Sequence, residues 1–154
     1  MKFRIRKAED PDFESVLSLV KELAEFQKMP ERVMNSVEQM KEEQEFFNCL
    51  VAENENNEIV AIASYFFAYY TWVGKSLYLD DLIVKQHYRG QKIGSGLLKE
   101  IFEIAKSQGC KRVRWQVSEW NKPALDFYRK CGAEIDKDCC NCDFDSKGIF
   151  DFRI

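Results

Sequence analysis

The sequence has few of the features that mark membrane, secreted or metal-binding proteins. Its longest uncharged run, residues 59–74, is shorter than the roughly 18 residues expected of a membrane-spanning helix. The N-terminal residues alternate charged and apolar side chains and lack the apolar core of a secretion signal. These absences favour a protein of the cytoplasm that does not bind membranes.

Metal-binding patterns are also weak. Six cysteines without an export signal predict reduced thiols, and three of them (Cys139, Cys140 and Cys142) form the segment "CCNC". This segment lacks the second ligand pair that zinc spacing requires, and the one histidine, His87, is far away in the sequence. We therefore expect no bound metal and interpret the segment as small residues near a surface turn.

Charge and size narrow the class of protein. Lys and Arg number 23 against 26 Asp and Glu, so the chain lacks the basic excess usual for a nucleic-acid binder. A net charge of −3 is compatible with a cationic ligand. With 154 residues, of which 45% are apolar, the chain is expected to form a single domain over residues 1–154 with a substantial core.

Hydrophobic periodicity predicts alternating strands and helices. Apolar residues at helical spacing, with Gly109 and Gly132 after two of the runs, mark four helices, and residues rich in β-branched and aromatic side chains mark six strands. We expect an α/β fold with a mixed central sheet and helices on both faces, in which residues 75–117 form a parallel crossover. The expected strands are 3–8, 49–53, 58–70, 75–85, 111–119 and 148–154; the expected helices are 10–29, capped by Asp10 or Asp12, 35–47, 93–109 and 121–132.

The stretch "YRGQKIGSGL", residues 88–97, forms a glycine-rich turn between an expected strand and helix. Unpaired N–H groups and the helix dipole favour an anion at such a helix start, and Arg89 and Lys92 add positive charge. The spacing does not match a P-loop, and it matches only two glycines of the dinucleotide-binding pattern. The glycines alone fit a phosphate site and a purely structural turn equally well.

Two longer stretches resemble a known family. "LYLDDLIVKQHYRGQKIGSGLLKEI" and "VSEWNKPALDFYRKCGA" resemble the GNAT superfamily of N-acetyltransferases. Together with "KELAEFQKM", "NCLVAE" and "YYTWVGKSLYLDDLIV", they resemble the diamine (spermidine/spermine) and thialysine acetyltransferases over nearly the whole chain. The resemblance implies the GNAT fold, acetyl-CoA as cosubstrate and a homodimer.

The resemblance also implies a coenzyme A site. The family pattern Arg/Gln-x-x-Gly-x-Gly/Ala, which holds the pyrophosphate through backbone N–H groups, reads here from Arg89 to Gly94, with Lys92 in place of the first glycine. The backbone of a nearby strand is expected to pair with the pantetheine arm as an added strand does. The implied cofactor-binding residues are Leu82, Ile83, Val84, Arg89, Gly90, Gln91, Lys92, Ile93, Gly94, Ser95, Asn121 and Tyr128.

Acetyl transfer to an amine needs a base for the ammonium proton and an acid for the departing thiolate. The resemblance assigns the base to Asp80, acting directly or through water, and the acid to Tyr128. Strand alternation places Asp80 and Asp81 on opposite sheet faces. Because Tyr128 adjoins Phe127 on a helix, we expect Phe127 to pack and Tyr128 to reach the reaction site. Carboxylates and aromatic rings attract cations, so the expected substrate-binding residues are Asp80, Asp81, Trp72, Glu119, Trp120 and Glu31.

We thus expect an acetyl-CoA-dependent N-acetyltransferase that acts on a small cationic amine by direct attack in a ternary complex. The acceptor is a polyamine, or thialysine or another lysine-like amino acid, and the sequence leaves these open. A covalent acyl-cysteine route is disfavoured because neither Cys110 nor Cys131 has a histidine nearby in the sequence. Two other readings remain: a non-catalytic acyl-CoA-binding module, and an acetyltransferase for protein substrates.

Overall fold

The computed structural model describes residues 3–137 and 141–153. Its chain divides into two compact units, Met1–Gln116 and Val117–Ile154. In order, the elements are β1 (Arg4–Lys7), η1 (Asp10–Asp12), α1 (Phe13–Phe26), η2 (Pro30–Arg32), α2 (Val37–Glu42), β2 (Asn48–Glu53), β3 (Ile59–Tyr70), β4 (Gly74–Val84), η3 (Gln86–Tyr88), α3 (Ile93–Ser107), β5 (Arg112–Arg114), α4 (Lys122–Lys130) and α5 (Ser146–Asp151).

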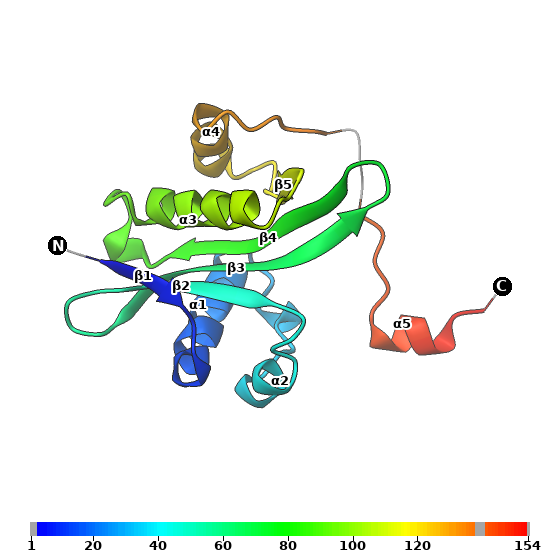
Figure 1. Cartoon of the computed structure of the whole chain (residues 1–154). Helices are drawn as coiled ribbons and strands as arrows, with labels where there is room; N and C mark the ends of the chain where they lie inside the picture. The colour runs from blue at the N-terminus through cyan, green and yellow to red at the C-terminus, as the bar shows by residue number, and fades with distance from the viewer. Residues whose placement is uncertain (1–2, 138–140, 154) are drawn as a thin grey trace. The chain divides into compact units, whose positions relative to one another are not determined.

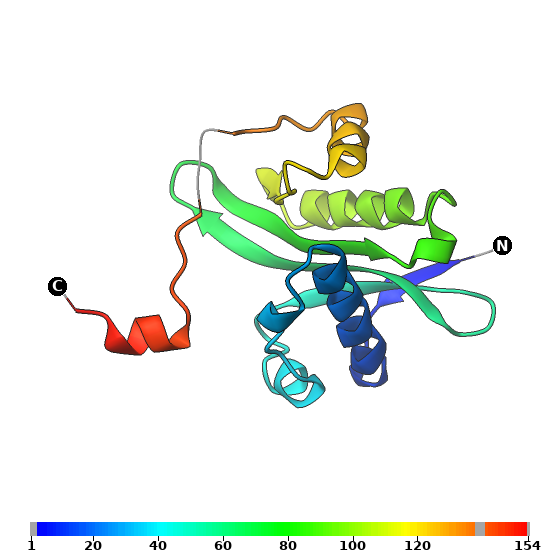
Figure 2. The same ribbon diagram turned by 180° about the vertical axis from the view of Figure 1, so that it is seen from behind.

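A five-stranded sheet in the order β1-β2-β3-β4-β5 forms the centre of the first unit (Figure 1). All neighbouring strands are antiparallel except β4 and β5, which are parallel and are joined through α3. Helix α3 lies on one face of the sheet, and α1 and α2 lie on the other, as both views show (Figures 1 and 2). The predicted mixed sheet with helices on both faces is therefore confirmed, as is the parallel crossover.

The face of the sheet that carries α1 is closed by an apolar core. Phe13, Val16 and Leu19 of α1 pack with Ile62 of β3 and Ile83 of β4 in one buried cluster. On the opposite face, Leu97 and Ile101 of α3 are completely buried. The spacing of apolar residues in α1 and α3 that predicted these helices is thus the spacing of the side chains that each helix buries.

The start of α1 differs from the prediction that an aspartate side chain caps it. The Asp12 carboxylate instead binds Arg6, at 2.6 and 2.9 Å, and accepts a hydrogen bond from the Glu9 backbone N–H. Arg6 also donates to Glu53. The pKa of Asp12 is lowered mainly by its hydrogen bond from Arg6. A charge-assisted hydrogen bond with a guanidinium is stronger than one with a neutral helix amide, so the Asp12 carboxylate pairs with Arg6.

Three predicted elements have different bounds or type. The second helix and the strand at 111–119 are shorter than predicted, spanning Val37–Glu42 and Arg112–Arg114. The strand predicted at 148–154 is wrong: Ser146–Asp151 is the helix α5, started by a hydrogen bond from the Gly148 N–H to the Asp145 carboxylate. This local cap stabilises a helical turn without a neighbouring strand, whereas β structure needs a pairing partner.

The described residues contain no helix long and apolar enough to cross a membrane. They also contain no group of three potential metal ligands. Cys139 and Cys140 of the "CCNC" segment lie outside the described residues, and Cys142 is exposed.

Candidate active site

A β-bulge interrupts the pairing of β3 and β4 at the two aspartates. Ser64 of β3 pairs with Asp81, and the next residue, Tyr65, pairs with Leu79. Asp80 is therefore the extra residue of β4, without a partner across the ladder. A bulge of this kind bends the strand and turns its side chains away from simple alternation.

The bulge changes how Asp80 and Asp81 lie relative to the faces of the sheet. Asp81 pairs with Ser64, two residues from the Ile62–Ile83 pair that packs against α1, so Asp81 lies on the α1 face. Beyond the bulge, Tyr78 pairs with Phe66 on this same face. Burial raises the pKa of both Tyr78 and Asp81, and the negative charge of Asp80 adds to each shift. The prediction of opposite faces rests on simple alternation, which holds only in a strand without a bulge.

The two carboxyl groups have different surroundings. Asp80 is exposed, and partial desolvation by the surrounding protein raises its pKa. Asp81 is partly buried, and burial together with the charge of Asp80 raises its pKa to about 6. The Ser64 hydroxyl lies 3.4 Å from an Asp81 carboxylate oxygen and opposes this shift. The same hydroxyl accepts a hydrogen bond from the Asp81 backbone N–H at 3.1 Å.

Cys49 lies on the same face, since it pairs with Ser64. The Cys49 thiol is buried, and burial together with the charge of Asp81 raises its pKa to about 12. A thiol with this pKa stays protonated and is a poor nucleophile at neutral pH. Cys49 thus packs on the same face as Asp81 and does not supply a reactive thiolate.

Directly after the bulge, β4 has a free edge. Strand β5 pairs with β4 only at residues 76–78, whereas residues 81–84 pair with β3 on the other side. Within the first unit, residues 79–84 therefore have no strand partner on the β5 side, and Leu82, Ile83 and Val84 belong to this open stretch. Such an edge can accept an extended chain that carries amide groups.

The glycine-rich turn leads from the end of β4 to α3. Gly90 and Lys92 both have left-handed backbone conformations, with φ of 77° and 63°. The hydrogen bond from Gly96 N–H to the Lys92 carbonyl, at 3.0 Å, opens the helical ladder. The N–H groups of Ile93, Gly94 and Ser95 therefore lie ahead of this ladder at the positive end of the helix dipole.

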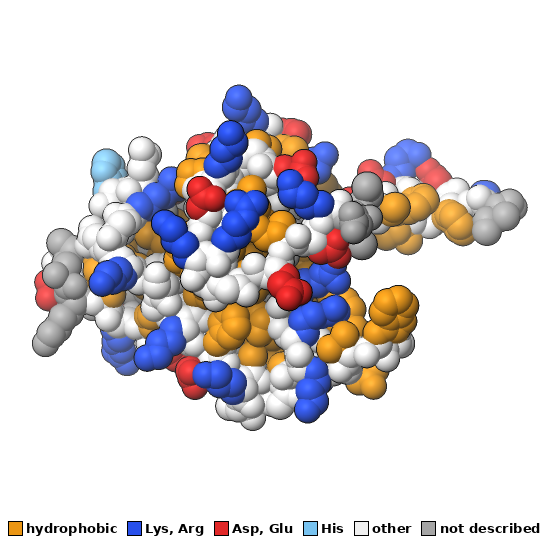
Figure 3. Space-filling view, turned by 90° about the horizontal axis from the view of Figure 1, so that it is seen from above, with side chains coloured by type: hydrophobic (Ala, Val, Ile, Leu, Met, Phe, Trp, Pro, Cys, Tyr) orange, Lys and Arg blue, Asp and Glu red, His pale blue; other side chains and the backbone are white. Residues whose placement is uncertain are grey.

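Arg89 and Gln91 have structural partners in this turn. The Arg89 guanidinium donates to the Val84 carbonyl at 3.1 Å and lies over the Phe26 ring. Gln91 donates to the His87 carbonyl. His87 is itself exposed, and the histidine side chain is visible in pale blue at the surface (Figure 3). These contacts fix the shape of the turn, whereas Lys92 contributes an exposed charge.

Asn121 and Tyr128 belong to α4 in the second unit. The Asn121 side chain accepts a hydrogen bond from the Ala124 N–H at 3.3 Å, so its predicted role as helix cap is confirmed. Tyr128 is buried and Phe127 half-buried, the reverse of the packing expected for this pair. Burial raises the pKa of Tyr128, and the charge of Cys131 adds to the shift. The phenol therefore keeps its proton at neutral pH.

The other predicted substrate residues belong to different elements and different units. Glu31 is exposed in η2, and Trp72 is 99% exposed in the turn between β3 and β4. Glu119 and Trp120 are exposed residues of the second unit, and Glu119 faces Lys137 at 3.8 Å. Of the predicted set, the structure groups Asp80 with Asp81. Trp72 lines a pocket with Arg112 and Arg114 rather than with carboxylates.

Three residues beside the predicted ones were not predicted from the sequence: Ser64, which contacts Asp81, and Arg112 and Arg114, which line the pocket with Trp72. The alternating "RVR" of residues 112–114 is a signal that places both arginines on one face of a strand. Ser64 had no comparable signal, because its contact with Asp81 depends on the strand register.

Comparison with known proteins finds the same family that the sequence motifs resemble. The model of the acetyltransferase (GNAT) family matches residues 6–133. The thialysine N-epsilon-acetyltransferase of Bos taurus is 39% identical over 141 residues, which are 84% of this chain and 83% of the relative. The spermidine/spermine N(1)-acetyltransferase-like protein 1 of Homo sapiens is 33% identical over 85% of this chain, but the match spans 20% of that protein.

Solved structures share the fold. The crystal structure of glucosamine-6-phosphate N-acetyltransferase from Arabidopsis thaliana superposes with a TM-score of 0.75 at 25% identity. The match covers 94% of this chain and all of that one.

Proposed function

The chain belongs to the acetyltransferase (GNAT) family, and on this premise we propose that it transfers the acetyl group of acetyl-CoA to a primary amine of a small cationic substrate. The favoured acceptor is thialysine or a similar lysine-like amino acid, because the thialysine enzymes are similar over most of both chains. The observation that carries the proposal is the pair Asp80 and Asp81 at the bulge, beside the open edge of β4.

Acetyl-CoA fits the features at the end of β4. Its pantetheine arm has amide groups that match the open edge at residues 82–84. Its pyrophosphate suits the N–H groups of residues 93–95, with the positive charge of Lys92 and Arg89 nearby. The left-handed backbone of Lys92 is the conformation that glycine adopts most easily, so the turn keeps its shape with a lysine in this position.

Asp80 and Asp81 are proposed to bind the acceptor and remove its proton. An alkyl ammonium with a pKa near 10.4 is almost fully charged at neutral pH and needs a base before its nitrogen can attack. Asp80 is the exposed member of the pair and accepts this proton directly or through water. Asp81, with a pKa of about 6, adds negative charge next to it. The free amine then attacks the thioester carbonyl in a ternary complex.

Tyr128 is proposed as the acid that protonates the departing thiolate. Its raised pKa keeps the phenol protonated, and a phenol and a thiol are close enough in basicity for the proton to transfer. Asn121, which starts the same helix, is proposed to help bind the cofactor. Glu31, Trp72, Glu119 and Trp120 remain proposed contacts of the acceptor.

Further proposals concern the domain, the location in the cell, the oligomeric state and the partners. The chain forms one acetyltransferase domain, which the family match over residues 6–133 supports. The enzyme works in the cytoplasm as a homodimer, without nucleic acid, membrane or metal. Size-exclusion chromatography with light scattering tests the dimer, and a monomeric mass would contradict it.

The test of the proposed function is thiol release from acetyl-CoA with a panel of acceptors: thialysine, lysine, spermidine, spermine and putrescine. We expect the highest kcat/KM with thialysine. A preference for spermidine or spermine would assign polyamine acetylation instead. Binding of coenzyme A without thiol release from any amine would contradict the proposal and favour an acyl-CoA-binding module, or an enzyme for protein substrates.

A further inference from the structure

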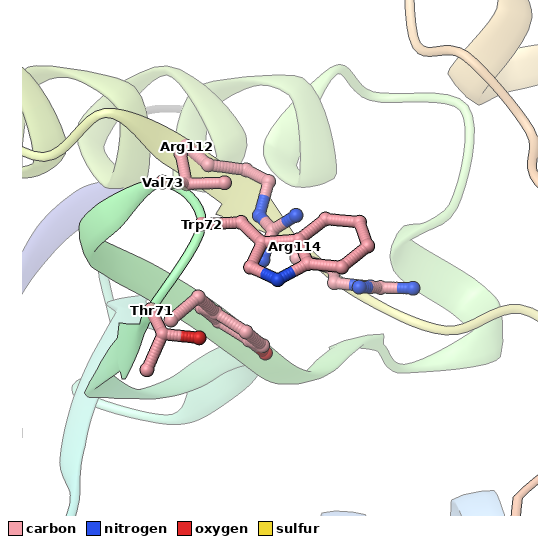
Figure 4. Close-up of a pocket in the computed structure, with 6 residues that line it drawn as sticks. Thr71, Trp72, Val73, Arg112 and Arg114 are labelled. Atoms are coloured by element: carbon pink, nitrogen blue, oxygen red, sulfur yellow. The ribbon is translucent and has the colours of Figure 1, made fainter.

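A pocket of about 280 Å³ lies at the far end of β4 from the glycine-rich turn (Figure 4). Residues of the β3–β4 turn and the two arginines of β5 line it: Tyr70, Thr71, Trp72, Val73, Arg112 and Arg114. Neither arginine forms an ion pair with a described residue of the first unit. The Nε of Arg112 is buried and has no hydrogen-bond partner among the described residues. Two guanidinium groups in one pocket, with no ion pair to a described residue of the first unit, suit an anion such as a carboxylate.

The pocket is on the same face of the sheet as Asp81. Arg114 pairs with Tyr78 and Arg112 with Ser76, and Tyr78 faces the α1 side opposite Phe66. The Arg112 guanidinium lies 4.1 Å from the centre of the Tyr70 ring, which belongs to the same face of β3. Burial raises the pKa of Tyr78, the charge of Asp80 raises it further, and the charge of Arg114 lowers it. A strip of polar side chains thus runs along the paired strands β4 and β5, formed by Asp80, Asp81, Tyr78, Arg114 and Arg112.

The spacing along this strip fits an amino acid with a terminal amine. Arg114 pairs with Tyr78, two residues before Asp80, and Arg112 pairs with Ser76, four residues before it. At the rise of a strand, these separations along β4 are about 7 and 13 Å. Extended thialysine spans about 8 Å from its terminal nitrogen to its carboxyl carbon, with bonds of about 1.5 Å or slightly more. An acceptor whose amine lies at Asp80 therefore places its carboxylate within reach of an arginine side chain.

We propose that Arg112 and Arg114 bind the α-carboxylate of a lysine-like acceptor and so select amino acids over polyamines. This inference rests on the proposed function and specifies its acceptor. Selectivity follows because a polyamine would bring a second ammonium toward two unneutralised guanidinium groups. A carboxylate instead forms charge-assisted hydrogen bonds with them, and the planar fork of each arginine allows two at once.

The pocket is separate from the proposed site of the cofactor phosphates. The glycine-rich turn follows Val84, whereas the arginines lie level with Ser76 and Tyr78. At the rise of a strand, this separation is about 20–26 Å. A cofactor that places its pyrophosphate at residues 93–95 and its thioester near the bulge therefore leaves this pocket to the acceptor.

The test compares thialysine with its decarboxylated analogue, bis(2-aminoethyl) sulfide, which keeps the amine and thioether. In the Arg114→Gln variant we expect kcat/KM for thialysine to fall about 10-fold, and in the Arg112→Gln/Arg114→Gln variant about 100-fold, mainly through KM. Turnover of the analogue should not fall, and it should rise where the repulsion of its second ammonium is relieved. Lys111→Gln is the matched control, since Lys111 is an exposed cation directly beside β5.

Arg114→Lys, which keeps the charge but loses the planar fork, should recover part of the loss for thialysine. If both amines lose activity equally, or neither does, the arginines do not bind the carboxylate and the inference is overturned while the proposed function stands. If the wild-type protein acetylates neither amine, the proposed function fails and the inference fails with it. Thermal unfolding of each variant separates loss of binding from loss of folding.

Discussion

The bulge and the glycine-rich turn, at the two ends of the open part of β4, differ in the groups that they present. The bulge presents side chains, and the turn presents backbone amides. At the bulge, the proposed chemistry depends on side chains: two adjacent carboxyl groups, one of them with a pKa of about 6. At the glycine-rich turn, it depends on the backbone: amide groups at residues 93–95 and a left-handed Lys92. At the bulge, substitutions that preserve shape but remove charge should therefore lower activity. At the turn, substitutions that alter the backbone conformation should matter more than those that alter charge.

The largest effect is expected where a side chain supplies a proton. Tyr128→Phe should lower kcat by about 100- to 1,000-fold, the range of lost general acid catalysis, with little change in coenzyme A affinity. Stopped-flow thiol release and calorimetric titration with coenzyme A measure the two quantities. Tyr69→Phe, at a 78% exposed tyrosine, is the control. An unchanged kcat would remove Tyr128 from the mechanism.

The second prediction concerns the exposed carboxylate of the bulge. Asp80→Asn should lower kcat/KM for thialysine about 100-fold at pH 7, because the amine then loses its proton without a base. The deficit should shrink as pH rises toward the acceptor pKa near 10.4, where the free amine becomes abundant. Rate profiles between pH 6 and pH 10 measure it, with Asp126→Asn on the exposed face of α4 as the control. A deficit independent of pH would count against Asp80 as base.

The third prediction separates function from stability at Asp81. Its pKa is about 6 in the folded protein against an ordinary 3.8, so the folded state holds the proton more tightly than the unfolded state. Folding stability is therefore lost as pH rises from about 4 to 6. Asp81→Asn should remove this loss and raise the free energy of unfolding at pH 7.5 by about 1–3 kcal/mol, at about 1.4 kcal/mol per pKa unit.

Urea unfolding of the wild type and Asp81→Asn at pH 3.5 and pH 7.5 measures this effect. The two proteins should differ little at pH 3.5, where the carboxyl group is protonated in both states. A variant less stable than the wild type at pH 7.5 would show that the Asp81 carboxylate stabilises the fold.

The smallest effect is expected at the glycine-rich turn. Lys92→Gly should stabilise the protein by about 1 kcal/mol, because a left-handed conformation costs roughly that much for a residue with a Cβ. Lys92→Ala removes the charge but keeps the strain, so the pair of variants separates the two contributions. Thermal unfolding and the KM for acetyl-CoA measure them. If Lys92→Gly destabilises the protein, its side chain has a stabilising role that outweighs the backbone strain.

Much of the fold could be predicted from local patterns. The helices α1, α3 and α4 follow from apolar spacing and their end signals: Gly109 and Gly132 have the left-handed conformations expected after a helix, and Asn121 caps α4. The bulge at Asp80 could not be predicted, because it depends on how β4 aligns with β3. The helix α5 was missed because "GIFDFRI" suits a strand by composition, whereas Asp145 starts a helix just before it.

The candidate site was predictable as residue types rather than as geometry. The motif around residues 80–94 identified the acids and the turn. It could not show that Asp81 is the more perturbed carboxyl, since its pKa reflects burial and the charge of its neighbour. The alternation of "RVR" places the two arginines of β5 on one face, but which face that is depends on how β5 pairs with β4.

The most direct test of the account is thiol release from acetyl-CoA with thialysine, comparing the wild type with the Asp80→Asn/Asp81→Asn variant at pH 7.5. The account predicts turnover by the wild type and a loss of at least about 100-fold in the variant, with coenzyme A binding retained. Equal turnover by the two proteins would contradict the claim that the bulge of β4 carries the catalytic carboxylates.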